Sequence, residues 1–288
     1  MRWLRAPAKL NLTLRVVGRR ADGYHELESL VAFAGLCDWL GYDPGDDLTL
    51  EVFGPRAGEA GPVPQNLVLR AARSLAAQIP ALRLGRFRLI KRLPAAAGLG
   101  GGSADAAAAL RFLASEVGLP VDDRRVLASA QAAGADVLAC LSPQARTIKG
   151  IGSELGPAIR LADTFAVLVN PRIPAPTSKV FAAFDLASEA KTEADFPRDP
   201  AEGIGSGAVL DFRALGHNDL VAAAIRVAPQ IKTVLERLSK VAEAKAFGMS
   251  GSGATCFALF SDRRSAAATR RSVAADHPEW WVEATKLR

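Results

Sequence analysis

The sequence predicts an α+β fold in two parts. Segments with the two-residue period of strands and segments with the helical period follow one another without a regular strand–helix–strand rhythm, which argues against a doubly wound parallel sheet. The character of the chain changes near Gly150, after which proline-broken and polar stretches become frequent. We therefore expect an N-terminal domain over residues 1–150 and a C-terminal domain over residues 151–288.

In the N-terminal half, the clearest strand is residues 8–17. Leu10, Leu12 and their successors alternate with Lys9 and Asn11, so the polar residues should share one face. Further strands are expected at 47–53 and 86–92. Helices are expected over 65–78 with Asn66 as N-cap, from about Ser103 to Val117, and over 121–134, opened by Asp122.

In the C-terminal half, short apolar runs predict strands at 165–171, 254–260 and 280–286. Helical periodicity predicts two helices near 218–240 and one over 262–275. Residues 171–181 contain three prolines and should be an irregular segment. Residues 185–212 are polar and dotted with glycine and proline, so we expect a long irregular loop.

The composition is that of an ordinary globular protein, with 49% hydrophobic and 23% charged residues. Cys37, Cys140 and Cys256 lack metal-binding spacing, which argues against a structural zinc site, and unpaired thiols fit a cytoplasmic protein. We expect no secretory signal and no membrane span. The net charge of +6 either serves solubility alone or suits an anionic partner, which would be nucleic acid or a phosphorylated small molecule.

The most informative segment is "KRLPAAAGLGGGSADAAAAL", residues 91–110, in which glycines stand between a strand and a helix. Glycines let backbone N–H groups approach an anion, and a helix N-terminus adds positive charge, so the segment predicts a phosphate cradle. It lacks the lysine of a Walker A loop and the third glycine of a dinucleotide fingerprint. The alternative is a flexible loop before an alanine-rich helix. The predicted phosphate-binding residues are Pro94, Gly98, Leu99, Gly100, Gly101, Gly102, Ser103 and Ala104.

Two further segments need an explanation. "FGMSGSGATCFALF", residues 247–260, is a second glycine-rich run, and it is either a plain loop or part of the same site as the cradle. "RRADGYHELESL", residues 19–30, places Tyr24 and His25 directly after a tight Asp-Gly turn, although the chain has only 2 Tyr and 3 His. The plain interpretation of that pair is a packed turn tyrosine beside a surface histidine.

These segments together resemble the GHMP kinases. The resemblance rests on "PAKLNLTLRVVGRRADGYHELESL", "LPAAAGLGGGSADAA" and "MSGSGATCFALF", in that order, and spans essentially the whole chain. Within the family it is strongest to the members that act on diphosphocytidyl-methylerythritol, through the DGYHEL turn, the GLGGGS loop, "GADV" at 134–137, "GIGSEL" at 150–155 and "PAPTSKVF" at 174–181.

The resemblance implies a fold, an activity and a co-substrate. The fold would be a ribosomal-protein-S5-like, ATP-binding N-terminal domain and a ferredoxin-like, substrate-side C-terminal domain. The activity would be ATP-dependent phosphorylation of the 2-hydroxyl of the diphosphocytidyl substrate, in the non-mevalonate route to isoprenoid precursors. Mg²⁺ would arrive with ATP, held mainly by phosphates and water, since no confident metal ligand is found.

The resemblance also implies roles for individual residues. Asp136 would be the general base and Lys9 its cationic neighbour, although Asp136 alone could be an N-cap or a structural ion-pair partner and Lys9 a solvated strand residue. Tyr24 would stack on cytosine and His25 would bind its edge. The other implied contacts are Asn11, Thr177 and Phe181 for the substrate, and Asn66, Leu67 and Lys91 for the adenosine of ATP.

Three departures from the family pattern stand out. Ala95, Ala96 and Ala97 replace an expected methionine and glycines, "LACL" follows GADV, and Asp105 stands where asparagine is common. The rival interpretations are another small-molecule kinase of the homoserine or mevalonate kinase type, a catalytically silent binding protein of the same fold, and an RNA-binding S5-like module. The dispersed lysines and arginines argue against a nucleic-acid partner.

Overall fold

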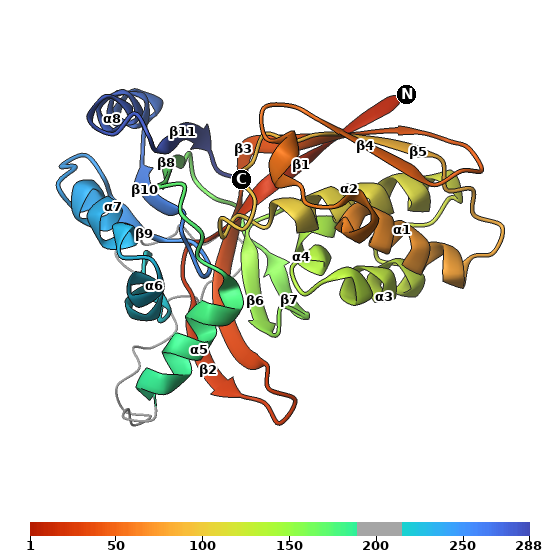
Figure 1. The fold of residues 1–288 in the computed structure, drawn as a ribbon, viewed down its shortest axis with the longest axis horizontal. Coiled ribbons are helices and arrows are strands. Elements are labelled where there is room, and N and C mark those ends of the chain that lie inside the picture. The colour runs from red at the N-terminus through yellow and green to blue at the C-terminus, as the bar shows by residue number, and fades with distance from the viewer. Residues whose placement is uncertain (189–214) are drawn as a thin grey trace. The chain divides into compact units, whose positions relative to one another are not determined.

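The computed structural model describes residues 1–188 and 215–288 (Figure 1). The chain forms two compact units, each assembled from separated segments. The first unit contains Met1–Lys9, Leu36–Ala95 and Gly100–Pro143, and the second contains Leu10–Gly35, Ala96–Leu99 and Gln144–Arg288. The predicted mixture of helices and strands is confirmed. The predicted functional division at residue 150 stays a prediction.

The first unit is built on strands β4 (Thr49–Phe53) and β5 (Arg86–Ile90), which pair in parallel. β5 also pairs antiparallel with the second half of β3 (His25–Asp43), with Trp39 opposite Ile90. β5 shows the expected alternation, because Phe87 and Leu89 are fully buried while its arginines face outward. β1 (Arg2–Asn11) pairs with β3 as well.

Helices of the first unit lie together beneath β4 and β5 in Figure 1. They are α1 (Leu67–Gln78), α2 (Gly101–Glu116), α3 (Arg124–Ala133) and α4 (Val137–Leu141), with short 3₁₀ turns η1 (Ala57–Glu59) and η2 (Val63–Gln65). α2 packs against the other three helices and is buried from Ala104 to Leu110. Its alanines suit this central place, because small side chains allow neighbouring helices to approach closely.

The second unit contains two groups of strands. The first half of β3 pairs with β2 (Arg15–Arg19) and β6 (Arg146–Gly150), and β6 pairs with β7 (Glu154–Ala158). A separate antiparallel sheet has the order β11-β8-β10-β9. Its strands are β8 (Phe165–Asn170), β9 (Ala246–Met249), β10 (Cys256–Phe260) and β11 (Trp281–Lys286).

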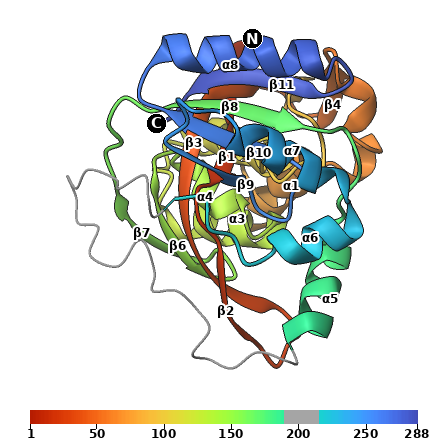
Figure 2. The ribbon, with the colours of Figure 1, turned by 90° about the vertical axis from the view of Figure 1, so that its left-hand side faces the viewer.

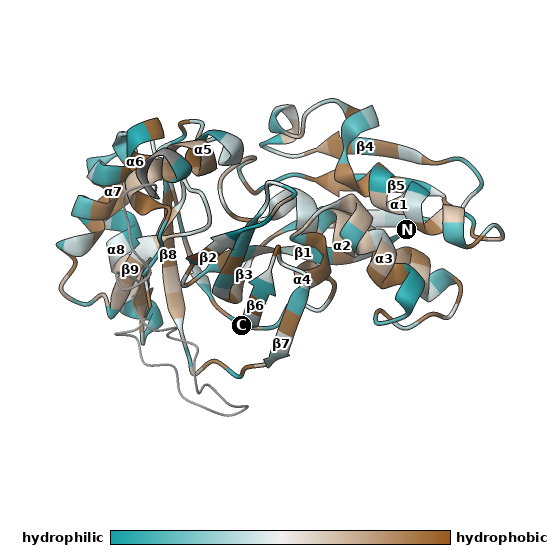
Figure 3. Ribbon diagram, turned by 90° about the horizontal axis from the view of Figure 1, so that it is seen from below, coloured by the Kyte–Doolittle hydropathy of each residue, from teal (hydrophilic) through white to brown (hydrophobic). Residues whose placement is uncertain are grey.

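The four described helices of the second unit are α5 (Thr177–Ser188), α6 (Val221–Val227), α7 (Gln230–Ser239) and α8 (Arg263–Asp276). α7 and α8 pack on the antiparallel sheet, and Figure 2 shows α8 running alongside β11 and β8. α7 buries Ile231, Val234 and Leu238, the spacing of one helical face. The hydrophobic residues of β8, visible as the brown strand in Figure 3, form the other side of this core.

Several sequence-based expectations about elements are wrong. The alternating segment 8–17 is two strands, β1 ending at Asn11 and β2 beginning at Arg15. Residues 171–181 are not wholly irregular, since α5 begins at Thr177, and Asp185–Ser188 extend it into the segment expected to be a loop. The rest of that expected loop, 189–212, lies outside the described residues. The helix expected to open at Asp122 begins at Arg124, capped by Asp123.

Three further observations concern the chain as a whole. Asn66 caps α1 as predicted, accepting a hydrogen bond of 3.0 Å from the Val68 backbone N–H. Cys37, Cys140 and Cys256 are buried free thiols. Within residues 1–188 and 215–288, no helix combines the length and the hydrophobicity that crossing a membrane requires.

Candidate active site

Lys9 and Asp136 form an ion pair in the first unit. The Lys9 Nζ lies 2.8 Å from Asp136 Oδ1; the lysine side chain is 4% exposed and the aspartate side chain 41%. Lys9 stands near the end of β1, and Asp136 occupies the N-cap position of α4 but makes no side-chain capping hydrogen bond. The capping role that the sequence left open for Asp136 is therefore not used. Instead, a buried ammonium group orients a carboxylate that solvent can reach.

The start of α2 lies directly against this pair. Gly100, the N-cap residue of α2, has a φ of +60°, and a Cβ atom placed on it would lie 3.3 Å from Lys9 Cβ and 3.9 Å from Asp136 Oδ2. No side chain caps the helix at this residue. Because the N-terminus of a helix attracts anions, the first turn of α2 offers a phosphate site beside the Asp136 carboxylate.

Leu67 of α1 lies at the same end of α2. A Cβ atom on Gly102 would come within 3.6 Å of Leu67 Cδ1, and it would meet no other nearby heavy atom at ordinary contact distance. Asn66 precedes Leu67 and is committed to capping α1. The structure thus brings Leu67, one of the two residues expected on the adenine side, to the glycine-rich helix start.

Residues 96–99 of the glycine-rich segment belong to the second unit, where the second glycine run holds them. Ser250 Oγ donates to the Gly98 carbonyl oxygen at 2.7 Å, and the Thr255 N–H donates to the Ala97 carbonyl oxygen at 3.2 Å. Gly98 has a φ of +72°, and a Cβ atom there would overlap the Ser250 carbonyl. Within the second unit, Ala97 and Gly98 of the first glycine-rich segment therefore contact the second glycine run.

Ala96 is a strained point of this segment. Its φ of +49° lies in the left-handed region that disfavours residues with a Cβ atom. Ala96 belongs to the alanine run that departs from the family pattern, so this departure places a residue with a side chain where glycine fits without strain.

Asn11 connects the second glycine run to β3. Its backbone N–H donates to Ser250 Oγ at 3.0 Å, and its side-chain Nδ2 donates to Ser29 Oγ at 2.7 Å. Asn11 is 5% exposed, so the polar face predicted for this strand is buried and hydrogen-bonded.

The Asp-Gly turn before Tyr24 forms as predicted. Gly23 has a φ of +87°, and Asp22 Oδ1 accepts a hydrogen bond from the Tyr24 N–H at 3.1 Å. This backbone hydrogen bond is the main cause that lowers the pKa of Asp22, and its partner Arg20 adds to it. The turn leaves Tyr24 63% exposed, so a face of its ring is open to a ligand.

His25 is arranged differently from Tyr24. Its ring stacks on Phe181 with ring centroids 4.6 Å apart, and its Nε2 lies 2.6 Å from Asp185 Oδ1. Phe181 and Asp185 are one helical turn apart on α5, so both reach the same histidine. The expected second aromatic wall, Phe181, thus contacts His25 rather than Tyr24. Thr177, at the start of α5, has its Oγ1 2.9 Å from Ser252 Oγ in the second glycine run.

The ammonium group of Lys91 pairs with two buried carboxylates. Its Nζ donates to Asp38 Oδ2 at 2.5 Å and to Asp105 Oδ2 at 2.8 Å, and all three residues are buried. Burial lowers the pKa of Lys91, but Asp105 and Asp38 together outweigh it, so the net pKa is raised. The expected contact of Lys91 with the ribose or adenine edge stays a prediction.

Three residues important to these arrangements were not found from the sequence. Asp185 and Asp38 pair with residues 160 and 53 positions away, and no local pattern indicates such pairs. Ser250 lies inside a run that was singled out only for its glycines. Asp105 did carry a signal, because a lone charge inside an alanine run of a buried helix needs a partner.

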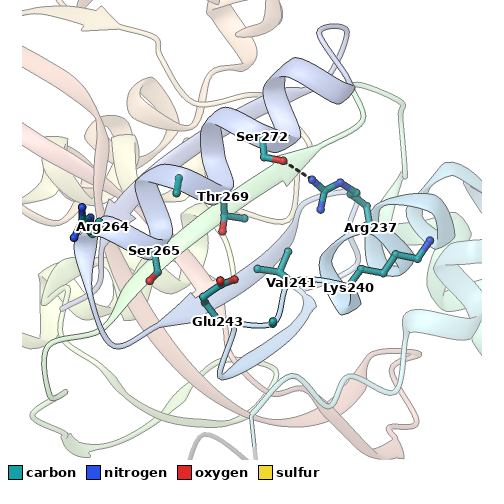
Figure 4. Close-up of a pocket in the computed structure, with 10 residues that line it drawn as sticks. Arg237, Lys240, Val241, Glu243, Arg264, Ser265, Thr269 and Ser272 are labelled. Atoms are coloured by element: carbon teal, nitrogen blue, oxygen red, sulfur yellow. Dashed lines mark hydrogen bonds between the residues drawn. The ribbon is translucent and has the colours of Figure 1, made fainter.

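Two features of the chain lie outside this constellation. A pocket of about 520 Å³ is lined by residues of the α7–α8 region, including Arg237, Lys240 and Thr269 (Figure 4), and none of the expected site residues lines it. Burial raises the pKa of the Cys140 thiol to about 12, with nearby Asp136 adding to the effect, so this cysteine is not a thiolate nucleophile near neutral pH.

Comparison with known proteins agrees with the geometry. Residues 66–144 match the model of the GHMP kinases N terminal domain, and residues 202–279 match that of the GHMP kinases C terminal domain. The chain is 53% identical over 286 residues to a 4-diphosphocytidyl-2-C-methyl-D-erythritol kinase of Methylorubrum extorquens, covering 98% of each protein. It is 50% identical to the enzyme of the same name from Azorhizobium caulinodans, covering 99% of this chain and 98% of that protein.

Solved structures give the same result. A crystal structure of 4-(cytidine 5'-diphospho)-2C-methyl-D-erythritol kinase matches with a TM-score of 0.78 and 32% identity, covering 99% of both chains. Mevalonate kinase from L. major matches with a TM-score of 0.68 at 16% identity, which shows the shared fold. Together with the two domain matches and the full-length relatives, this identifies the chain as a member of the GHMP kinase family and an ATP-dependent small-molecule kinase.

Proposed function

We propose that this kinase transfers the γ-phosphoryl group of ATP to the 2-hydroxyl of 4-diphosphocytidyl-2-C-methyl-D-erythritol, in the non-mevalonate route to isoprenoid precursors. The observation that carries the proposal is the Lys9–Asp136 pair, packed against the N-cap glycine of α2. The names of relatives about half identical over the whole chain supply the substrate.

In the proposed reaction, Asp136 takes the proton of the attacking substrate hydroxyl. The hydroxyl oxygen forms a bond to the γ-phosphorus of ATP, and ADP leaves. Asp136 suits this role because its carboxylate is partly exposed and does not cap α4. Lys9 keeps the carboxylate oriented and stabilises the negative charge that develops on the hydroxyl oxygen. In phosphoryl transfer, such positioning and charge stabilisation account for most of the catalysis.

The ATP phosphates would bind the first turn of α2 and the glycine segment before it. The proposed contacts are Pro94, Gly98, Leu99, Gly100, Gly101, Gly102, Ser103 and Ala104, with Asn66 and Leu67 toward the adenosine. This assignment is supported by the position of Leu67 beside Gly102 and by the positive φ angles of Gly98 and Gly100, which favour glycine at these two positions.

Magnesium would accompany ATP and help to neutralise the transferring phosphoryl group. The described parts of the chain contain no group of three or more His, Cys, Asp or Glu side chains suited to a metal ion. In the proposed reaction the metal is held mainly by phosphates and water, and every step above is assigned to residues of the chain.

The cytidine end of the substrate would bind residues of the second unit. Tyr24 offers an exposed ring for stacking, and Phe181 and Thr177 of α5 and the buried Asn11 would supply further contacts. Because Asp185 occupies His25 Nε2, we assign His25 the edge of the cytosine through its backbone or its remaining ring nitrogen.

The proposal is tested by measuring ADP release with a panel of acceptors: the diphosphocytidyl substrate, homoserine and mevalonate. We expect ADP release to exceed the background rate only with the diphosphocytidyl substrate. Turnover of homoserine or mevalonate, with none of the diphosphocytidyl compound, would assign the chain to another branch of the family.

Replacing Gly102 by Val should weaken ATP binding without unfolding the protein. The added Cβ atom would lie in the first turn of α2, at an ordinary contact distance of 3.6 Å from Leu67 Cδ1. Loss of one charge-assisted hydrogen bond, worth about 1.5–3 kcal/mol, should raise the KM for ATP by about 10- to 100-fold. The matched control is Gly45→Val in the β3–β4 turn, and equal KM values for the two variants would argue against the cradle.

Replacing Tyr24 by Ala should selectively weaken the binding of the diphosphocytidyl substrate. Stacking of a base on an aromatic ring is worth about 1–3 kcal/mol, so its KM should rise by roughly 5- to 150-fold while the KM for ATP stays the same. Tyr24→Phe should behave like the wild type, because it keeps the ring. An equal loss for both substrates would show that Tyr24 has a packing role.

A further inference from the structure

Asp38, Lys91 and Asp105 form a buried charge cluster in the first unit, which we call the buried triad. Asp38 lies on β3, Lys91 directly follows β5, and Asp105 lies in α2. Asp38 is 0% exposed, Lys91 4% and Asp105 1%. The triad therefore ties two strands of the sheet to the helix that begins with the phosphate-binding glycines.

Two parts of the glycine-rich segment belong to the first unit, residues 91–95 and 100–110, and the buried triad contacts both. The Lys91 ammonium lies 3.2 Å from where a Cβ atom on Gly101 would be, so it lies beneath the first residue of α2. Asp38 Oδ1 accepts hydrogen bonds from the backbone N–H groups of Arg92 and Leu93, at 2.5 and 2.8 Å, just before Pro94. Displacement of the triad would therefore move both the entry to the cradle and the helix start.

The net charge of the buried triad depends on whether one of its two carboxyl groups is protonated. Two ionised carboxylates and one ammonium would leave a net charge of −1 in the core, beside a site for an anionic ligand. Asp38 accepts three hydrogen bonds, from Lys91, Arg92 and Leu93. Asp105 Oδ2 accepts one from Lys91, while its buried Oδ1 has no hydrogen-bond partner within residues 1–188 and 215–288.

Asp105 is therefore the carboxyl group whose surroundings favour a bound proton. The groups that face it are Lys91 at the end of β5, Asp38 on β3 and the Cys140 thiol on α4. Burial raises the pKa of Asp105 to about 7, the ammonium of Lys91 opposes this rise, and Asp38 adds to it.

We propose that the buried triad is a charge-neutral floor beneath the ATP-phosphate site, and that Lys91 and Asp105, the latter as a neutral acid, are positioning residues for ATP. The inference rests on the proposed ATP-binding role of the glycine-rich segment. Lys91 thus acts through α2 and the 91–94 backbone instead of touching the nucleotide. Loss of the Asp105 proton places a negative charge under the cradle and weakens ATP binding.

The protonated form of Asp105 also sets the direction in which pH changes the free energy of unfolding. Folded Asp105 keeps its proton up to about pH 7, whereas the unfolded chain releases it near pH 4. Between these values the folded state binds more protons than the unfolded state, so this group makes the free energy of unfolding fall as pH rises. Asp105→Asn should remove this contribution.

The test measures the dissociation constant of Mg-ATP by calorimetry, without acceptor, from about pH 6 to about pH 8.5. We expect the wild-type constant to rise by on the order of 10-fold across this range, the effect of one added charge near the phosphates. Asp105→Asn should match the wild type at the acidic end and stay flat. Asp46→Asn, which alters an exposed aspartate paired with Arg83, is the matched control and should follow the wild type.

Lys91→Met supplies a second measurement. It leaves two buried carboxylates without a cation, so we expect a KM for ATP raised at least about 10-fold, with the KM of the acceptor unchanged. Lys232→Met, at an exposed lysine of α7, is the matched control. If Lys91→Met does not fold, the pH profile of Asp105→Asn decides the question.

Two results would overturn the inference: the same pH dependence of ATP binding in Asp105→Asn as in the wild type, or a Lys91→Met protein that loses kcat while both KM values stay unchanged. Failure of the proposed function is a separate outcome. A wild-type protein that binds ATP as described, but does not phosphorylate the diphosphocytidyl substrate, would overturn the substrate assignment alone.

Discussion

Asp136→Asn should lower kcat by about 10²- to 10⁴-fold, the usual contribution of a general base. Asparagine keeps the size of the side chain but cannot take the proton of the attacking hydroxyl. The fold should be retained, because the Asp136 side chain is 41% exposed and makes no capping hydrogen bond. Steady-state kinetics should show a large loss in kcat with the two KM values close to those of the wild type.

The control for this variant is Asp122→Asn, at an exposed aspartate of the same unit. It should have wild-type kinetics, and thermal unfolding should show that both variants are folded. A near wild-type kcat for Asp136→Asn would mean that the carboxylate is structural and that catalysis rests on positioning alone.

Lys9→Met should produce the second largest effect, a loss in kcat on the order of 10²- to 10³-fold. Methionine keeps most of the buried aliphatic volume that packs against Gly100, but it removes the ammonium that lies 2.8 Å from Asp136. The carboxylate loses its orientation and the developing alkoxide loses its cation. The expected loss lies in kcat, because neither the glycine segment nor the Tyr24 turn is altered.

The two substitutions should be strongly non-additive. Lys9 acts through Asp136, so the double variant should be only slightly slower than the slower single variant. Four proteins, the wild type, both single variants and the double variant, complete the cycle. Losses in kcat that multiply in the double variant would show that the two residues do not share one site.

Features fixed by local chemistry were predictable from the sequence. The Asn66 cap depends on a side chain and a backbone N–H two residues apart. The turn before Tyr24 needs only Asp22 and a glycine with positive φ. The glycine-rich helix start was recognisable for the same reason.

Features that depend on distant partners were not predictable in the same way. β3 is a strand of 19 residues whose central part is buried on both faces, so it lacks the alternation that reveals half-exposed strands. The segment 8–17 alternates between polar and hydrophobic residues, yet its polar residues Lys9, Asn11 and Thr13 are buried, because distant segments of the chain pack against them. α5 was missed because prolines precede it, although proline before a helix is compatible with its first turn.

The candidate site shows the same division. The sequence indicated Lys9 and Asp136 only through the family resemblance, because the two residues stand more than a hundred positions apart in the chain. Lys91 was likewise assigned to the nucleotide only through the family resemblance, and no local pattern indicated its buried partners Asp38 and Asp105. Buried charges need partners wherever these lie in the chain, and sequence spacing does not show them.

The central claim, phosphorylation of the 2-hydroxyl of the diphosphocytidyl substrate, is tested most directly by ³¹P NMR of the reaction mixture. The 2-carbon carries a methyl group and no hydrogen, so a phosphate on its oxygen has no three-bond proton coupling. We expect one new phosphomonoester signal, a singlet that grows with the ADP signals in the presence of the wild type and not of folded Asp136→Asn. A proton-coupled phosphomonoester signal, or ADP formation without any new ester, would contradict the claim.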